Sequence, residues 1–170
     1  MRTKSWIHQL SELKDQTIAF GKMKPMAPDT VTCRFIARGH ILEYMDVGPD
    51  RRLPILFFGP NEFAVRSHPA LTQFETMDDT SLEVFTHGKI IELLRNFPNS
   101  AIHYKEMRRR YKQKVADRLK MDSMKTAIER YHYARQQQDW IFSVAEHKDI
   151  AVYLGISLPE WLDLKRKDNV

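Results

Sequence analysis

The sequence contains a single cysteine, Cys33, among 170 residues. One cysteine excludes a disulfide framework within the chain, and it excludes a zinc site or an iron–sulfur cluster held by several thiolates of one chain. The seven histidines match no metal-binding spacing such as H-E-x-x-H. We therefore expect no metal and no other cofactor.

Long hydrophobic runs are also missing. The longest apolar stretch, 53–58, contains Pro54 and is far shorter than the ~20 residues that span a bilayer. The N-terminal residues become polar too soon for a signal peptide. With 42% hydrophobic and 29% charged residues, the composition is that of an ordinary globular protein. We expect a cytoplasmic protein without a membrane partner.

Catalytic motifs are lacking as well. The sequence has neither a nucleophile motif nor a glycine-rich phosphate loop. Asp78 and Asp79 form an acidic pair at a predicted turn, where solvated carboxylates are common. Cys33 falls in a predicted strand, which favours a small buried side chain over a reactive thiol. We expect that the protein is not an enzyme.

Positive charge is concentrated in the second part of the chain, and the net charge is +5. Residues 1–99 contain 12 basic and 12 acidic residues, whereas residues 100–170 contain 15 basic and 10 acidic residues. Eight of the basic residues lie between 105 and 120. This asymmetry favours a polyanionic partner for the second part, and the alternative is a well-solvated helix face.

The first part of the chain is dominated by strand patterns. Residues 1–20 have a helical period, which runs through Trp6, Leu10, Leu13 and Ile18. After residue 20 the sequence turns to short β-rich runs separated by glycine and proline turns. The clearest runs are 32–38, 40–45 and 53–58. This texture predicts an antiparallel sandwich or barrel.

The chain becomes helical from about residue 86, where Ile90, Ile91, Leu93 and Leu94 form an apolar face. A long helix is predicted from a cap at Asn99 and Ser100 to about residue 121. Its apolar side chains form one narrow stripe, which consists of Tyr104, Met107, Tyr111, Val115 and Leu119. A narrow stripe suits packing against one partner, and we predict a homodimer. The alternative is a helix lying on its own domain.

A further helix is predicted from about 125 to 137, with Ile128, Tyr131 and Ala134 facing inward. Residues 147–166 then have the spacing of a helix-turn-helix. Gly155 can adopt the positive φ of a tight turn, and Ser157 and Glu160 have capping-box spacing. The shared core of the two helices would consist of Ile150, Ala151, Leu154, Ile156, Trp161 and Leu164.

A helix-turn-helix would place residues 158–167 in the major groove of DNA and the first helix near the phosphates. The residues expected to contact DNA are Lys148, Ser157, Leu158, Glu160, Asp163, Lys165, Arg166 and Lys167. The alternative is an ordinary helical hairpin without a DNA contact.

Taken in order, these elements resemble the Crp/Fnr family of bacterial transcription regulators. The resemblance is carried by residues 35–44, 58–63, 78–84, 127–131 and 150–157. It implies an α+β fold in which an antiparallel β-roll of the jelly-roll type, like a cyclic-nucleotide-binding domain, precedes a long dimerisation helix and a helix-turn-helix domain. The implied boundaries are 1–98, 99–121 and 122–170.

Two departures from the family pattern bear on function. Cyclic-nucleotide binders of the family carry Gly-Glu and then Arg-Ser/Thr-Ala, and this sequence lacks an arginine at the matching distance, since Arg66 comes too early. The matching residues form the predicted effector pocket, which consists of Asn61, Glu62, Ala64, Val65, Arg66, Thr72 and Gln73. We predict that cyclic AMP does not bind in the usual way and that any small-molecule effector is a different one.

The second departure lies in the recognition helix, where the family commonly has Glu-x-x-Ser-Arg. This chain has Pro159, Leu162 and Asp163 at those positions. The leading hypothesis is a dimeric Crp/Fnr-like DNA-binding regulator. The alternative is a sensor or interaction module that keeps the fold and has lost base readout.

Overall fold

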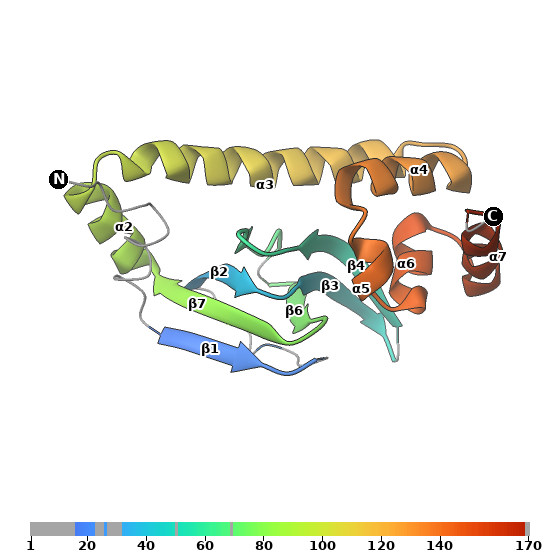
Figure 1. Ribbon diagram of the computed structural model, residues 1–170, viewed down its shortest axis with the longest axis horizontal. Helices are drawn as coiled ribbons and strands as arrows, with labels where there is room; N and C mark the ends of the chain where they lie inside the picture. The colour runs from blue at the N-terminus through green and yellow to red at the C-terminus, as the bar shows by residue number, and fades with distance from the viewer. Residues whose placement is uncertain (1–15, 23–25, 27–31, 50, 69, 169–170) are drawn as a thin grey trace.

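The computed structural model describes residues 16–22, 26, 32–49, 51–68 and 70–168 (Figure 1). The strands are β1 (Gln16–Phe20), β2 (Thr32–Arg38), β3 (Ile41–Gly48), β4 (Arg51–Phe58), β5 (Phe63–Ala64), β6 (Thr72–Thr76) and β7 (Thr80–Thr86). The helices are α2 (His87–Asn96), α3 (Ser100–Asp122), α4 (Ala127–Gln138), α5 (Ile141–Val144), α6 (His147–Leu154) and α7 (Leu158–Asp168).

The strands form two antiparallel sheets. One has the order β1-β7-β2-β5 and the other the order β4-β3-β6. Their facing sides bury apolar side chains such as Ile36, Ile41 and Leu82, which are fully covered. Antiparallel sheets followed by helices confirm the predicted α+β class. The closure of the strands into a jelly roll stays a prediction.

The helix predicted over residues 1–20 is wrong for residues 16–20, and residues 1–15 lie outside the described part of the chain. Residues 16–20 form β1, which pairs with β7 from Gln16 opposite Val84 to Phe20 opposite Thr80. The partner strand is more than 60 residues away in sequence. A helical period within 20 residues carries no signal of such a distant pairing.

Helices α2 and α3 agree with their predicted ranges and differ in detail. The Thr86 side chain accepts a hydrogen bond from the Lys89 amide and caps α2. Ile90 and Leu93 are buried, but Ile91 is exposed, so the predicted apolar face is narrower. The predicted cap by Asn99 is wrong in mechanism, because its side chain makes no capping hydrogen bond.

Helix α3 spans 23 residues, about 34 Å, and runs along the whole molecule (Figure 1). Helix α2 lies at one end of the molecule and α7 at the other. Helix α4 folds back from the end of α3, and its capping box joins Thr126 and Glu129. Tyr131 and Ala134 are buried as predicted, whereas Ile128 is exposed and not inward.

One hydrophobic cluster connects the sheets to the C-terminal helices. Leu42, Tyr44 and Phe57 of β3 and β4 pack in the same cluster as Ile150 of α6 and Trp161 of α7. The Phe57 ring meets the Tyr153 ring edge-on, with centroids 4.8 Å apart. The C-terminal helices therefore share their core with the β-sheets.

Candidate nucleic-acid interface and effector cavity

Helices α6 and α7 meet at the turn predicted from Gly155. Its φ and ψ of 65° and 39° are left-handed, and a side chain would strain the backbone there. The amide of Ile156 donates to the Ala151 carbonyl over 3.0 Å, which satisfies the end of α6. The predicted turn at Gly155 is confirmed.

The start of α7 is fixed by the predicted capping box. The Ser157 amide and hydroxyl donate to the Glu160 carboxylate over 2.8 and 2.6 Å. The Glu160 amide donates back to the Ser157 hydroxyl over 3.4 Å. These hydrogen bonds to Ser157 lower the pKa of Glu160, so its carboxylate stays charged near neutral pH. Ser157 and Glu160, both predicted to contact DNA, therefore already cap the N-terminus of α7.

The core of this corner matches its prediction. Ile150, Ala151, Leu154 and Trp161 are buried, and Ile156 and Leu164 pack against the same cluster. These side chains therefore hold α7 against α6 through one face of each helix.

The opposite face of the corner is exposed and mixed in character. Leu158, Leu162 and Val152 on α6 and α7 are 42, 39 and 41% exposed. Asp163 pairs with Arg166 over 2.6 Å and offsets its charge. The other predicted cations differ, since Lys167 is exposed and Lys165 is half-buried. Lys148, on α6, is exposed and pairs with Glu146 over 2.8 Å.

Several basic residues of the charge-rich segment already have partners within the chain. Arg109 and Arg110 pair with Glu106 over 2.7 and 3.0 Å. The Arg118 guanidinium donates to the Tyr153 carbonyl at the end of α6 over 2.8 Å. Arg109 and Arg110 remain exposed, and the Glu106 carboxylate offsets part of their charge, whereas the Arg118 side chain is largely covered.

Lys114 of α3 also turns inward, and its ammonium contacts the Phe57 carbonyl over 2.9 Å and Glu62 over 3.0 Å. Burial lowers the pKa of Lys114, and the Glu62 carboxylate opposes that shift. Glu62 also accepts a hydrogen bond from the Gly59 amide over 2.8 Å. Asn61 and Glu62 line a cavity of about 230 Å³ beneath α3.

The other predicted effector residues do not share that cavity. Ala64 and Thr72 are buried in the sheets. The Arg66 guanidinium donates to the Thr72 carbonyl over 3.3 Å, and Gln73 donates to Asp46 over 2.7 Å. Val65 alone lines a second cavity, of about 640 Å³, between α2, α3 and the sheet. The predicted pocket residues thus lie in several places.

The apolar stripe of α3 packs largely on its own chain. Tyr104 and Met107 contact the cluster around Phe63 and Phe85, and Tyr111 and Val115 contact the cluster around Ile36. Leu119 is 66% exposed, as is Ile102 at 68% on the same helix. The contacts of Tyr104, Met107, Tyr111 and Val115 are those expected if the helix lies on its own domain, which was the alternative to dimerisation. Dimerisation through α3 stays a prediction.

A charged cluster that the sequence did not reveal connects β4 to α6. The Arg52 Nε donates to Asp149 Oδ1 over 2.8 Å, and Nη1 donates to Glu75 over 2.6 Å. Asp149 and Glu75 are buried. Burial disfavours the charged guanidinium, but the hydrogen bonds to Asp149 and Glu75 outweigh it and raise the pKa of Arg52. Glu75 and Asp149 lie 23 and 97 positions from Arg52 in sequence, so no short sequence motif contains all three residues.

Within the described ranges, no group of histidine, cysteine and acidic side chains could hold a metal ion. No helix of the described part is both long enough and apolar enough to cross a bilayer. The Asp78 carboxylate accepts a hydrogen bond from the backbone amide of His40 over 2.7 Å. Its other oxygen lies 2.7 Å from Nδ1 of the His40 ring. Asp78 therefore fixes a turn.

The chain matches no protein-family model and no curated protein sequence. It is similar to solved structures. FixK2 from Bradyrhizobium japonicum is 19% identical, with a TM-score of 0.71, over 91% of this chain and 86% of FixK2. A cyclic nucleotide-binding domain containing protein from Listeria monocytogenes EGD-e is 12% identical, with a TM-score of 0.78, over 96% of this chain and 90% of that one.

The c-di-GMP responsive global regulator CLP of Xanthomonas campestris is 12% identical, with a TM-score of 0.71, over 96% of this chain and 90% of CLP. This chain has the Crp/Fnr fold. The Crp/Fnr neighbours are transcription regulators, and their fold consists of an antiparallel β-domain followed by helices, as here. The resemblance found in the sequence is therefore confirmed at the level of the fold.

Proposed function

We propose that this protein is a Crp/Fnr-type transcription regulator that contacts DNA through the corner of α6 and α7. The observation that carries the proposal is this corner, in which Gly155 turns the chain and Trp161 fixes α7 by one face. The opposite face of α7 is left exposed. A second helix held in this way is what a helix-turn-helix inserts into the major groove.

The proposed regulator has three parts, a β-roll sensor at 1–98, a dimerisation helix at 99–121 and a DNA-binding part at 122–170. Support for this division comes from α3, which joins the two other parts and carries exposed Ile102 and Leu119. Two copies of α7 in a dimer would read half-sites about 34–36 Å apart. The proposal further holds that cyclic AMP is not bound in the usual way.

Selection of genomic fragments by the full-length protein, followed by sequencing, tests the proposal. A selected site should bind at least ~10³-fold more tightly than random DNA of equal length at physiological salt. Binding that ignores sequence and disappears as salt rises would contradict it, because such behaviour is that of phosphate contacts alone.

Variants of α7 locate the contact. Lys165→Gln with Lys167→Gln should lower the slope of log affinity against log salt by about 1 to 2, since each lost phosphate contact removes about 0.9. Lys89→Gln is the matched control, because α2 lies at the opposite end of the molecule from α7 (Figure 1). Equal slopes for both variants would place DNA elsewhere.

The second candidate function is an interaction module without base readout. It is favoured by exposed Val152, Leu158 and Leu162 on the face that would meet DNA, and by the carboxylate of Asp163. Asp163→Arg discriminates between the two functions. Stronger DNA binding by this variant would support a helix that faces the groove, and unchanged DNA binding would favour the interaction module.

A further inference from the structure

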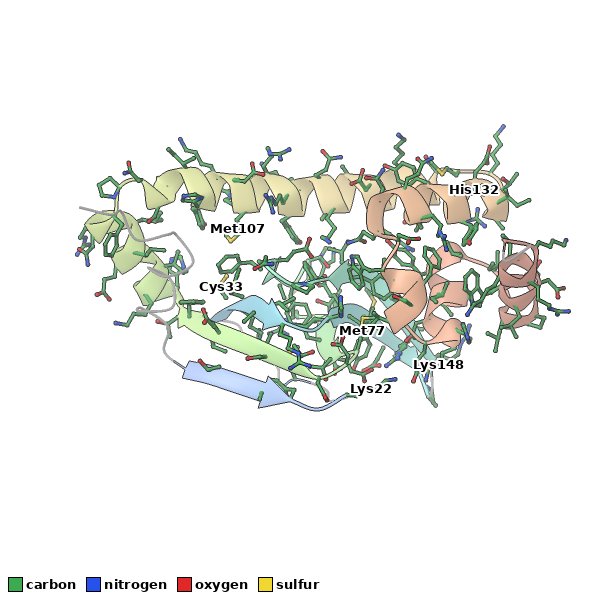
Figure 2. All side chains as sticks on the ribbon, in the orientation of Figure 1. Lys22, Cys33, Met77, Met107, His132 and Lys148 are labelled. Atoms are coloured by element: carbon green, nitrogen blue, oxygen red, sulfur yellow. The ribbon has the colours of Figure 1, made fainter. Side chains whose placement is uncertain are left out.

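The cavity of about 640 Å³ is formed by four elements that are distant in sequence. Cys33 comes from β2, Phe63 from β5, and His87 and Ile90 from α2, while α3 contributes Tyr104, Met107, Arg108, Tyr111 and Lys112. Figure 2 shows the sulfur atoms of Cys33 and Met107 on opposite sides of this space, one at the sheet and one below α3. The volume lies within the 300–1,000 Å³ typical of small-molecule sites.

The wall of the cavity is apolar. Phe63 and Ile90 are buried with Phe85 in one cluster, and Tyr104 and Met107 pack against that cluster. Cys33 adds a neutral group, because burial raises the pKa of its thiol to about 12. A ligand that fills this space would therefore present an aliphatic or aromatic body to the wall.

The charge at the cavity has one sign. Arg108 and Lys112 of α3 line it, and none of the lining residues in the described part is acidic. No carboxylate of the described residues forms an ion pair with Arg108 or Lys112, whereas Arg109, one residue away, pairs with Glu106 over 2.7 Å. The Arg108 guanidinium lies 6.0 Å from the centre of the Tyr104 ring, beside the apolar wall.

We propose that this cavity binds a medium-chain fatty carboxylate, whose chain packs against the wall while its carboxylate faces Arg108 and Lys112. A single anionic head on an apolar tail matches both the one-sided charge and the apolar lining. This site differs from the predicted effector pocket, of which only Val65 lines the cavity. The inference rests on the proposed function only for the role of such a ligand as an effector, and its binding needs no DNA.

Isothermal titration of the full-length protein with hexanoate, octanoate and decanoate, kept below micelle-forming concentrations, tests the proposal. Affinity should rise about fourfold for each added methylene, as expected for burial of the chain. Decanol should bind about tenfold more weakly than decanoate, because it lacks the charged head, and decylamine should bind more weakly still. Equal affinities for decanoate and decanol, or no saturable binding, would overturn the proposal.

Two variants separate this site from adventitious lipid binding. Arg108→Gln with Lys112→Gln should reduce decanoate affinity about tenfold and leave decanol affinity unchanged. Lys105→Gln is the matched control, because Lys105 is exposed on the same helix and does not line the cavity. Equal losses in both variants, or displacement of decanoate by cyclic AMP, would contradict the assignment. Since the assay contains no DNA, its result is independent of whether α7 binds a promoter.

Discussion

At the scale of single residues, Gly155 allows the left-handed turn between α6 and α7. An added Cβ at this position would not clash, since its nearest neighbour is the Arg130 guanidinium at 3.8 Å, an ordinary van der Waals contact. Only the left-handed backbone is strained, and Gly155→Ala should therefore lower the free energy of unfolding by about 1–2 kcal/mol in urea denaturation.

Gly88 of α2 provides the opposite case. Its φ is not positive, and an added Cβ would meet only the Thr86 hydroxyl at 3.9 Å. Gly88→Ala should raise the free energy of unfolding by roughly 0.5–1 kcal/mol, because alanine loses less entropy in a helix. The same sign of change for both variants would contradict the assignment of strain to Gly155.

Glu43 is a buried carboxyl on β3, and it accepts hydrogen bonds from the Ser67 amide and hydroxyl. Burial raises the pKa of Glu43 above its ordinary value of 4.5, although hydrogen bonds from Thr72 and Ser67 oppose the shift. Above pH 4.5 the unfolded chain loses this proton before the folded one does, so stability falls as pH rises through that range. Glu43→Gln should lack this fall in urea titrations from pH 4 to 7.

Glu129 supplies the control of opposite sign. Hydrogen bonds from the Thr126 backbone and side chain lower the pKa of Glu129, so its contribution is present above its ordinary value of 4.5 and is lost as pH falls. Stability differences for Glu43→Gln and Glu129→Gln that change with pH in the same direction would refute the burial argument.

At the scale of elements, the Arg52 cluster holds α6 against β4 and β6. Its guanidinium faces Asp149 and Glu75, whose side chains are 4 and 10% exposed. Arg52→Gln leaves two buried carboxylates without their cation and should lower the free energy of unfolding by about 3 kcal/mol. The exposed neighbour Arg51 is the control, and Arg51→Gln should change stability by less than about 0.5 kcal/mol. A double-mutant cycle with Asp149→Asn measures the coupling.

The elements differ in how well the sequence predicts them. The α6–α7 corner was predicted because its signals are local, with Gly155 and the Ser157–Glu160 cap inside one short window. The helical spacing of apolar residues also predicts the apolar face of α3. A period cannot reveal what covers a face, and Tyr111 and Val115 turned out to pack on the sheets of the same chain.

The candidate sites also differ in whether their residues are close together in the sequence. The residues of α7 that we propose to face DNA could be predicted as a set because they share one helix. The cavity residues could not, since Cys33 and Met107 are 74 positions apart and line the same cavity only in the folded chain. Arg52 and Asp149 were missed for the same reason.

At the scale of the whole molecule, the proposed dimer is the main prediction. Leu119 is 66% exposed on α3, so Leu119→Lys should leave the protomer folded while weakening self-association at least tenfold in sedimentation equilibrium. Leu71→Lys is the control, because Leu71 is 60% exposed outside α3. A monomeric wild-type protein, or equal effects of both changes, would exclude this interface.

The core that joins Phe57 to Tyr153 has a consequence for how the protein loses its structure. A C-terminal piece cut away after α3 would leave Leu42 and Phe57 facing water and would strip the same helices of their support. Sheet and helices should therefore melt in a single cooperative step. Because α6 and α7 share this core with the sheets, we expect a ligand that shifts the sheets to change the position of α7 as well.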